Sequence, residues 1–243
     1  MLSISQIASI LSVRSVSTVG LATLILGVYS IKYLDDYHQW LEIEVPGGPP
    51  PNRIGYMASC FLTLLFRRDK RNPKSLKSDE AGGYLNAKDL PTRSSSPPKM
   101  AHWVIPHRQV TQIAFDLDKD NTEASNVDSF FSELIKKHND CFTGPSRVEK
   151  NIKALFFKTA TAKNEVIHRH VKDGSFHVKL HCQDAKIVLE KKWGELFPTT
   201  LKLFTNCTPI DEIVLLYAPQ SEKDYPIYKI IVEAALKHYE SLS

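Results

Sequence analysis

Apolar and polar residues alternate most regularly between residues 166 and 181, in the stretch VIHRHVKDGSFHVKLH. Side chains on a β-strand point alternately to the two faces of a sheet, so this pattern predicts two strands. Asp173-Gly174 lies between them and is a strong local signal for a hairpin with a two-residue turn. The register set by such a turn pairs Val171 with Phe176, His170 with His177, His168 with Lys179 and Val166 with His181.

This register separates apolar from polar side chains. One face carries Ile167, Val171, Phe176, Val178, Leu180 and Cys182. The other face carries Val166, His168, His170, His177, Lys179 and His181, and so holds four of the nine histidines of the chain. A slip of one residue would mix the two sets, which favours the predicted pairing.

Other periodic segments predict the partners of this hairpin. Apolar residues at helical spacing predict helices over residues 126–138 and from 221 to near the end, and Asp184 begins a shorter helix ending near 192. Short strands are expected at 152–157 and 212–218, with an entering strand near 103–112 that Pro106 interrupts. The predicted fold is α+β, an antiparallel sheet with helices packed on one face.

Residues 15–31 contain no charged side chain and lie between Arg14 and Lys32. This is near the lower limit of about 17–25 residues for a membrane-spanning helix. A cleaved signal peptide and a buried helix of a soluble domain are the alternatives, but no small-x-small cleavage site follows promptly. We interpret residues 1–14 as a tail and 15–34 as a single-pass transmembrane helix that precedes the folded domain. Flanking charges leave its orientation open, while the basic residues from Arg67 to Lys77 favour a cytosolic C-terminal portion.

Residues 35–99 differ in composition from the C-terminal part of the chain and are interpreted as a membrane-proximal segment and linker. Residues 54–66 are apolar but too short to span a bilayer, and basic residues come directly after them. A helix at the membrane surface and a buried helix of the domain explain this segment equally well. Residues 72–99 are rich in Ser, Pro, Lys and Gly, so the folded domain is expected at 100–243.

Composition and motifs exclude several classes of function. The net charge of +4, without a basic stripe that carries interleaved aromatic residues, argues against a nucleic-acid partner. The four cysteines form no Cys-x-x-Cys pair, which supports neither a zinc ribbon nor a disulfide framework. Neither a glycine-rich nucleotide motif nor a serine-hydrolase motif is present.

The histidine face has three interpretations. Imidazoles on neighbouring strands can converge on a metal ion, but no carboxylate is evident on that face and Lys179 would repel a cation, so no metal is expected. Acid–base catalysis is the second interpretation, because imidazole titrates near neutral pH. A solvated polar sheet face is the third and has nearly equal weight.

Three further residues are candidates near the histidines. Trp193 can stack on a flat ligand, although packing in the core is the commoner fate of a single Trp. Glu195 can orient a histidine. Arg108 can pair with an anionic or enolic oxygen, or be an ordinary surface residue.

Short motifs occur along most of the chain in a recognisable order. The C-terminal half contains I-H-R-H at 167–170, D-G-S-F-H at 173–177, W-G-E at 193–195 and L-L-Y-A-P at 215–219. The N-terminal half contains D-Y-H-Q-W-L-E at 36–42, R-I-G-Y at 53–56, L-L-F-R at 64–67, D-L-P at 89–91 and I-P-H-R-Q at 105–109. Together they resemble the luciferase-domain family, which includes the luciferases of luminous mushrooms.

The resemblance implies a membrane-associated enzyme that adds dioxygen to a hydroxylated hispidin, an α-pyrone bearing a catechol, without metal or flavin. Decay of the resulting peroxide yields light. We therefore expect dioxygen as co-substrate, no cofactor, a phenolic or pyrone substrate, and a location in the endoplasmic reticulum or another endomembrane. The expected catalytic residues are His168, His170 and His177. The expected substrate-binding residues are His107, Arg108, Asp173, Lys179, Trp193, Glu195 and Tyr217.

One position departs from the family pattern. The family has His before the Pro of W-G-x-x-H-P, and this chain has Phe197 before Pro198. The D-G-S turn also resembles the family at large more than its luminous members. If that histidine is catalytic, the chain is a non-luminous relative. A non-catalytic, membrane-anchored module that binds a small molecule or a protein is the alternative to a luciferase-like oxygenase.

Overall fold

The computed structural model describes residues 30–43, 48–66, 69–76, 82–117, 125–149, 152–160, 162–198 and 211–242, together with Gly20 and Gly27. At its centre is a six-stranded antiparallel sheet with the order β1-β2-β3-β4-β6-β5. The strands are β1 (Cys141–Pro145), β2 (Lys153–Lys158), β3 (Lys163–Arg169), β4 (Phe176–His181), β5 (Gly194–Leu196) and β6 (Asp211–Leu216).

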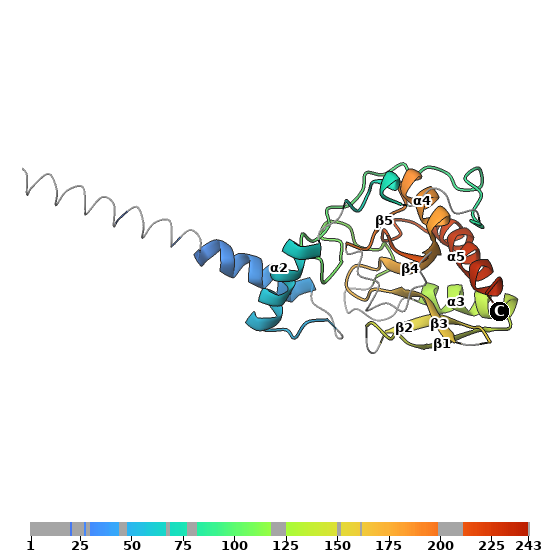
Figure 1. Ribbon diagram of the computed structural model, residues 1–243, viewed down its shortest axis with the longest axis horizontal. Helices are drawn as coiled ribbons and strands as arrows, with labels where there is room; N and C mark the ends of the chain where they lie inside the picture. Colours follow the sequence, from blue (N-terminus) through green and yellow to red (C-terminus); the bar gives the residue numbers. More distant parts are fainter. Residues whose placement is uncertain are drawn as a thin grey trace, which may run out of the picture.

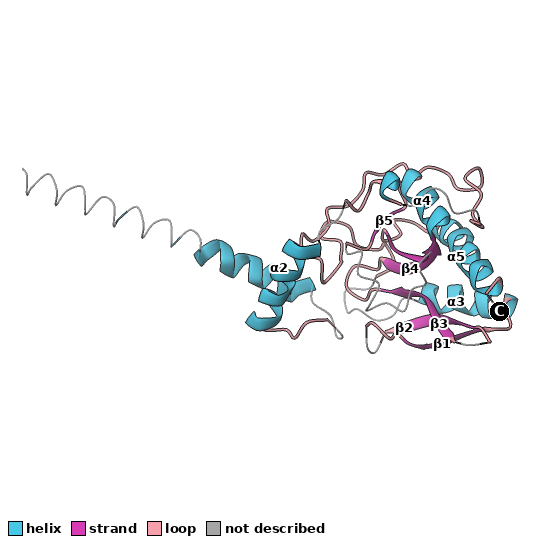
Figure 2. Ribbon diagram, in the orientation of Figure 1, coloured by secondary structure: helices cyan, strands magenta, loops and turns pink. Residues whose placement is uncertain are grey.

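Three helices cover one side of this sheet (Figures 1 and 2). They are α3 (Ser125–Lys137), α4 (Cys182–Glu190) and α5 (Asp224–Glu240). A helix over 30–43, α2 (Arg53–Phe66) and the short 3₁₀ helix η1 (Pro73–Ser75) precede them along the chain. The predicted α+β class and antiparallel sheet are therefore confirmed.

The apolar face of the central hairpin packs against the helices. Ile167, Phe176, Val178 and Leu180 are buried in one core with α5 residues such as Tyr228. Burying each such side chain contributes on the order of 1.5–3 kcal/mol, so this face fixes how the sheet sits on the helices. The opposite face is left for the polar side chains.

The hairpin is shifted by two residues from the predicted register. His168, rather than His170, lies opposite His177, and Ile167 lies opposite Val178. The two-residue turn was wrong because Gly174 has a φ of 73° while Asp173 does not have a positive φ, and a type I′ turn needs both. A shift of two residues preserves the faces, so the separation of polar from apolar side chains survived the error.

A wider loop replaces the tight turn because the Asp173 side chain accepts a hydrogen bond from a backbone N–H group that the tight turn would have paired differently. The Asp173 carboxylate accepts hydrogen bonds from the Ser175 N–H at 2.9 Å and the Ser175 hydroxyl at 2.7 Å. It also accepts from the Gln109 N–H at 2.8 Å. The loop is thus tied to a distant segment of the chain.

A register shift in β3 changes which residues share a face. Ile167 pairs with Leu155 and Glu165 pairs with Phe156, which leaves Val166 without a Cα partner. The extra residue brings Glu165 and His168 to the same side, although strict alternation would separate them. Val166, predicted on the histidine face, packs in the core instead.

His181 also departs from its predicted place. It ends β4 and is the N-cap of α4, where its Nδ1 accepts a hydrogen bond from the Gln183 N–H. Its ring lies 5.3 Å from the ring of His238 on α5. His181 therefore does not belong to the histidine face.

Residues 82–117 form no helix or strand longer than one bridge, yet they are packed against the domain. Leu85 and Leu90 are part of the main core. The Asp184 carboxylate accepts hydrogen bonds from the backbone of Tyr84 and Leu85, and the Trp193 indole donates to the Pro91 carbonyl. A domain cut at residue 100 would lose these contacts.

A second, smaller core joins the N-terminal helices to the domain. It contains Trp40 of the helix over 30–43, Tyr56 of α2, Ala101 and Trp103. The other side of α2 exposes a row of large apolar side chains, namely Ile54, Met57, Phe61, Leu64 and Leu65. The predicted transmembrane helix at 15–34 lies largely outside the described residues, and within the described part no helix has the length and apolarity to cross a bilayer.

Candidate active site

Three histidines meet at the loop end of the β3–β4 hairpin. The rings of His168 and His170 lie 5.3 Å apart, and the rings of His170 and His177 lie 4.3 Å apart. The Nε2 atom of His170 is 3.0 Å from Nδ1 of His177. All three side chains are buried, so the interpretation as a solvated sheet face was wrong.

A buried ion pair lies against this cluster, and its two residues come from two other segments of the chain. The guanidinium of Arg108 forms a salt bridge with Glu149 and lies 3.0 Å from Nε2 of His170. Arg108 and Glu149 are themselves buried, and Glu149 Oε1 lies 3.5 Å from His170 Nε2 and 3.7 Å from His168 Nε2. The cluster is therefore charged at its edge and closed to bulk water.

Each histidine is held from outside the cluster by a hydrogen bond. Nδ1 of His168 lies 2.8 Å from the Glu165 carboxylate. Nδ1 of His170 lies 2.7 Å from the Ser175 hydroxyl. Nε2 of His177 lies 3.2 Å from Nδ1 of His107. These contacts fix the orientation of the three rings.

His107 links the cluster to a second group of charges around Glu195. Nε2 of His107 lies 2.9 Å from Glu195, which also forms salt bridges with Lys70 and Arg71 at 2.9 Å each. The prediction that Glu195 orients a histidine is thus consistent with its contact with His107.

Burial and neighbouring charges set the ionisation of these groups. Burial lowers the pKa of His107 to about 4, and burial together with the Arg108 charge lowers that of His170 to about 4. Burial and the charge of His170 lower the pKa of His177 well below its usual range. Burial also lowers the pKa of His168, but Glu149 and Glu165 raise it more, so the net shift is upward. Three of these four imidazoles are therefore neutral at pH 7.

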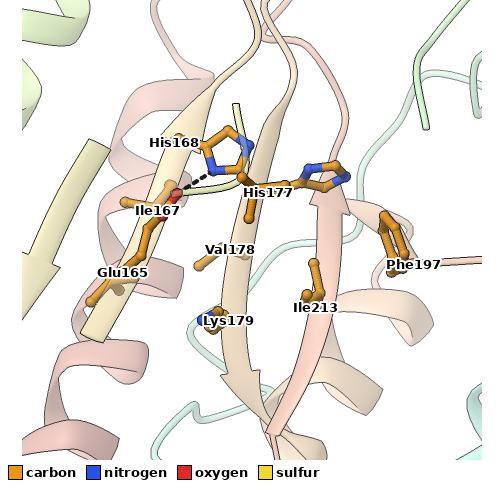
Figure 3. A pocket seen from close by; sticks show the side chains of 10 residues that line it. Glu165, Ile167, His168, His177, Val178, Lys179, Phe197 and Ile213 are labelled. Carbon is orange, nitrogen blue, oxygen red and sulfur yellow. Dashed lines mark hydrogen bonds and ion pairs between the residues drawn. The ribbon is translucent and has the colours of Figure 1, made fainter. Parts of the chain in front are cut away.

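A small cavity of about 50 Å³ adjoins the cluster. His168 and His177 point to one end of it, Phe197 lies beside His177, and Lys179 lies at the other end (Figure 3). The Phe197 ring is 5.5 Å from the ring of His107 and 5.6 Å from that of His177. Dioxygen or a water molecule fits this volume, whereas drug-sized ligands occupy about 300–1,000 Å³.

The structure brings together most of the predicted site residues. His107, Arg108, His168, His170, His177 and Glu195 form one connected network, and Lys179 lines the cavity. Asp173 supports the loop, with Oδ1 3.6 Å from Nδ1 of His170. Trp193 packs in the main core, so its proposed stacking on a ligand was wrong. Tyr217 is buried beneath the Arg71 and Arg93 guanidinium groups, outside the cavity lining.

Sequence reasoning missed two carboxylates of the cluster. Glu165 was hidden by the register shift at Val166, and Glu149 lies in a loop that has no periodicity. The argument against a metal site therefore rested on a wrong premise, because Glu149, His168, His170 and His177 each offer a ligand atom within 4.8 Å of the others. Lys179 pairs with Ile213 rather than lying opposite His168.

Comparison with known proteins agrees with the predicted resemblance. Residues 163–235, which include all three clustered histidines, match the Luciferase domain family. This segment of the chain is therefore similar to the Luciferase domain.

Similarity to fungal luciferases extends over most of the chain. It is 28% identical to a luciferase of Neonothopanus nambi over 219 residues, covering 83% of this chain and 79% of that protein. It is 24% identical to a luciferase of Armillaria mellea over 247 residues, covering 92% and 88%. The chain is thus a distant relative of the fungal luciferases, and no solved structure matches it.

The first prediction concerns the stability that Glu195 supplies. His107 and Lys70 lower its pKa from the ordinary 4.5 to about 2 despite its burial. A lowered carboxylate pKa contributes stability above about pH 4.5, and this is lost as the pH falls toward about 2. Glu195→Gln should therefore lower the free energy of unfolding at pH 7 by about 2–5 kcal/mol, and by less near pH 3. Denaturant unfolding of both proteins at several pH values measures this difference.

The exposed Glu222→Gln is the matched control and should differ little from wild type throughout. A loss for Glu195→Gln that does not vary between pH 7 and pH 3 would contradict the linkage.

Proposed function

We propose that this protein is a membrane-anchored, luciferase-like oxygenase that adds dioxygen to an electron-rich enolic or phenolic metabolite, such as a hydroxylated pyrone. The observation that carries the proposal is the convergence of His168, His170 and His177 beside a small cavity. These histidines fall within the segment that matches the Luciferase domain. Distant similarity to fungal luciferases over most of the chain supports the same reaction class.

The reaction needs no external reductant. The substrate loses a proton, its electron pair forms a bond from carbon to oxygen, and both oxygen atoms of dioxygen enter a peroxide that is then protonated. Negative charge passes from the enolate to the peroxide during this step. Arg108 and Lys179 place positive charge near the cavity, and fixed charges in a closed site stabilise such a transition state.

His168 and His177 are the imidazoles that line the cavity. They are therefore the groups placed to touch the reacting oxygen. The cavity volume accommodates dioxygen but not a pyrone together with its catechol. Phe197 and Lys179 are large side chains of the lining that would have to move for a ring to enter.

The same small cavity favours one alternative function. A cluster closed to water, with its charges paired, also suits a non-catalytic module whose buried network holds the fold together. Such a protein would bind a ligand or partner elsewhere and would leave dioxygen unchanged. Oxygen consumption separates the two functions.

We also propose that the chain is a single-pass protein of the endoplasmic reticulum or another endomembrane. The uncharged run at 15–31 and the exposed apolar row of α2 support this location. A helix whose apolar side faces the bilayer and whose C-terminal end is followed by basic residues is typical of the membrane interface. Arg67 and Arg68 follow α2 in the sequence, whereas the nearby Lys70 and Arg71 form salt bridges with Glu195.

The full-length protein should sediment with membranes and stay there after carbonate washing, because a spanning helix is not released by disrupting charge interactions. Immunoblotting of pellet and supernatant measures this. Complete release by carbonate would leave only a peripheral attachment.

The reaction itself is tested with detergent-purified protein, hydroxylated hispidin and air. Wild type should consume dioxygen, and His177→Gln should lower turnover by about 10²–10⁴-fold, as expected when a group acting on the reacting atoms is removed. His102→Gln, which alters an exposed histidine outside the cluster, should leave the rate unchanged. An oxygen electrode and product analysis measure the rates. Absence of oxygen uptake by folded wild type would favour the binding module.

The identity of residue 197 is expected to affect how much light is emitted per dioxygen consumed. Its ring occupies one side of the cavity where the family pattern has a histidine, so no titratable group reaches the substrate from that position. We expect wild type to emit little light per dioxygen consumed, and Phe197→His to emit more. Simultaneous luminometry and oxygen uptake give the ratio, and an unchanged ratio would show that residue 197 does not control emission.

A further inference from the structure

We infer that Glu149, His168, His170 and His177 bind a divalent first-row transition-metal ion. Each side chain offers one ligand atom, and these atoms lie within 4.8 Å of one another. His170 Nε2 is 3.0 Å from His177 Nδ1 and 3.5 Å from Glu149 Oε1. Bonds of about 2.1 Å to one ion place neighbouring ligand atoms roughly 3.0–3.4 Å apart, so small adjustments complete the site.

Hydrogen bonds around the cluster leave the inward nitrogens of His170 and His177 as acceptors, and that of His170 accepts from the Arg108 guanidinium. Ser175 donates its hydroxyl proton to Asp173, so it accepts from Nδ1–H of His170, and Nε2 of His170 carries a lone pair. The ionised Glu195 accepts from Nε2–H of His107. Nδ1 of His107 then accepts from His177, and the inward Nδ1 of His177 also carries a lone pair.

These two nitrogens lie 3.0 Å apart, and because both carry a lone pair they cannot form a hydrogen bond with each other. An electrophile that both can share relieves their repulsion. Histidine ligands in metal sites are held in this way, with the outer nitrogen donating to a carboxylate or another acceptor. Glu165 holds His168 in the same manner.

Two buried atoms of the cluster have no hydrogen-bond partner among the described residues. They are Nε2 of His168, which lies 3.7 Å from Oε1 of Glu149, and Oε2 of Glu149. Leaving a buried polar group unsatisfied costs on the order of 1–3 kcal/mol, more when it is charged. A metal ion satisfies both atoms at once.

The charge of the surroundings permits a cation. Two carboxylates, those of Glu149 and Glu165, lie beside the imidazoles, against one guanidinium, that of Arg108. Arg108 also contacts Nε2 of His170, and this contact must be given up when an ion binds. Its salt bridge uses Oε1 of Glu149, so Oε2 stays available.

Three imidazoles and one carboxylate suit Fe²⁺, Co²⁺, Ni²⁺, Cu²⁺ or Zn²⁺ better than Mg²⁺ or Ca²⁺. An ion held by His168 and His177 would border the cavity that these residues line. Binding of the ion does not depend on the oxygenase activity proposed above.

The test is elemental analysis of the full chain, purified in detergent without a polyhistidine tag. We expect about one equivalent of a transition metal per chain, as for a four-ligand site. Glu149→Gln and His168→Gln should lower metal affinity by at least 10–100-fold, the loss seen even for supporting residues. His102→Gln should retain the ion, because His102 is exposed and outside the cluster.

Metal-stripped wild type is then titrated anaerobically with Fe²⁺, Co²⁺ and Zn²⁺. We expect saturable binding, a rise in melting temperature, and visible absorption of the cobalt form that reports nitrogen ligands. This titration uses no variant, so a variant that fails to fold does not decide the result.

Folded wild type that copurifies with no metal and shows neither saturation nor a change in melting temperature would overturn the inference. Oxygen uptake is measured on the same samples. Oxygen uptake by protein that binds no metal overturns the metal site and leaves the oxygenase standing. Metal binding without oxygen uptake overturns the oxygenase and leaves the metal site standing.

Discussion

Burying several imidazole rings in contact with one another is the constraint on which the rest of this structure depends. Buried polar atoms need partners, and two nitrogens on each ring must be accounted for. Glu165, Ser175 and His107 supply the outer contacts of the three clustered histidines. Each of these partners is itself held in place. The register shift in β3 positions Glu165, Asp173 accepts a hydrogen bond from Ser175, and Glu195 contacts His107.

The hairpin could be predicted from the sequence because its information is local. Alternation over residues 167–180 predicted which side chains face the helices, and this prediction survived an error of two residues in the register. The turn itself was mispredicted because Asp173 bonds to Gln109, a residue 64 positions away. The local preference of Asp-Gly for a tight turn does not take account of that distant contact.

The site could be predicted only in part for the same reason. The histidines share one short segment, and His107, Arg108 and Glu195 lie in motifs that resemble the luciferase-domain family. Glu149 belongs to no repeating pattern and reaches the cluster only through the fold. Glu165 could not be placed beside His168 from the sequence. Its position depends on the unpaired residue Val166, and strict alternation of side chains does not predict such a residue. Trp193 is the opposite case. The sequence suggested a role in ligand binding, but the residue packs in the main core.

The irregular segment at 82–117 has a consequence for the order in which the protein folds. It has almost no backbone ladder of its own and is fastened by single side chains such as Asp184, Trp193 and Asp173. These contacts join parts of the chain about 100, 102 and 64 residues apart, so forming them carries a large loop-closure cost until the sheet exists. We therefore expect the histidines to spend the early stages of folding uncovered, and to be sealed from water in one of the last steps.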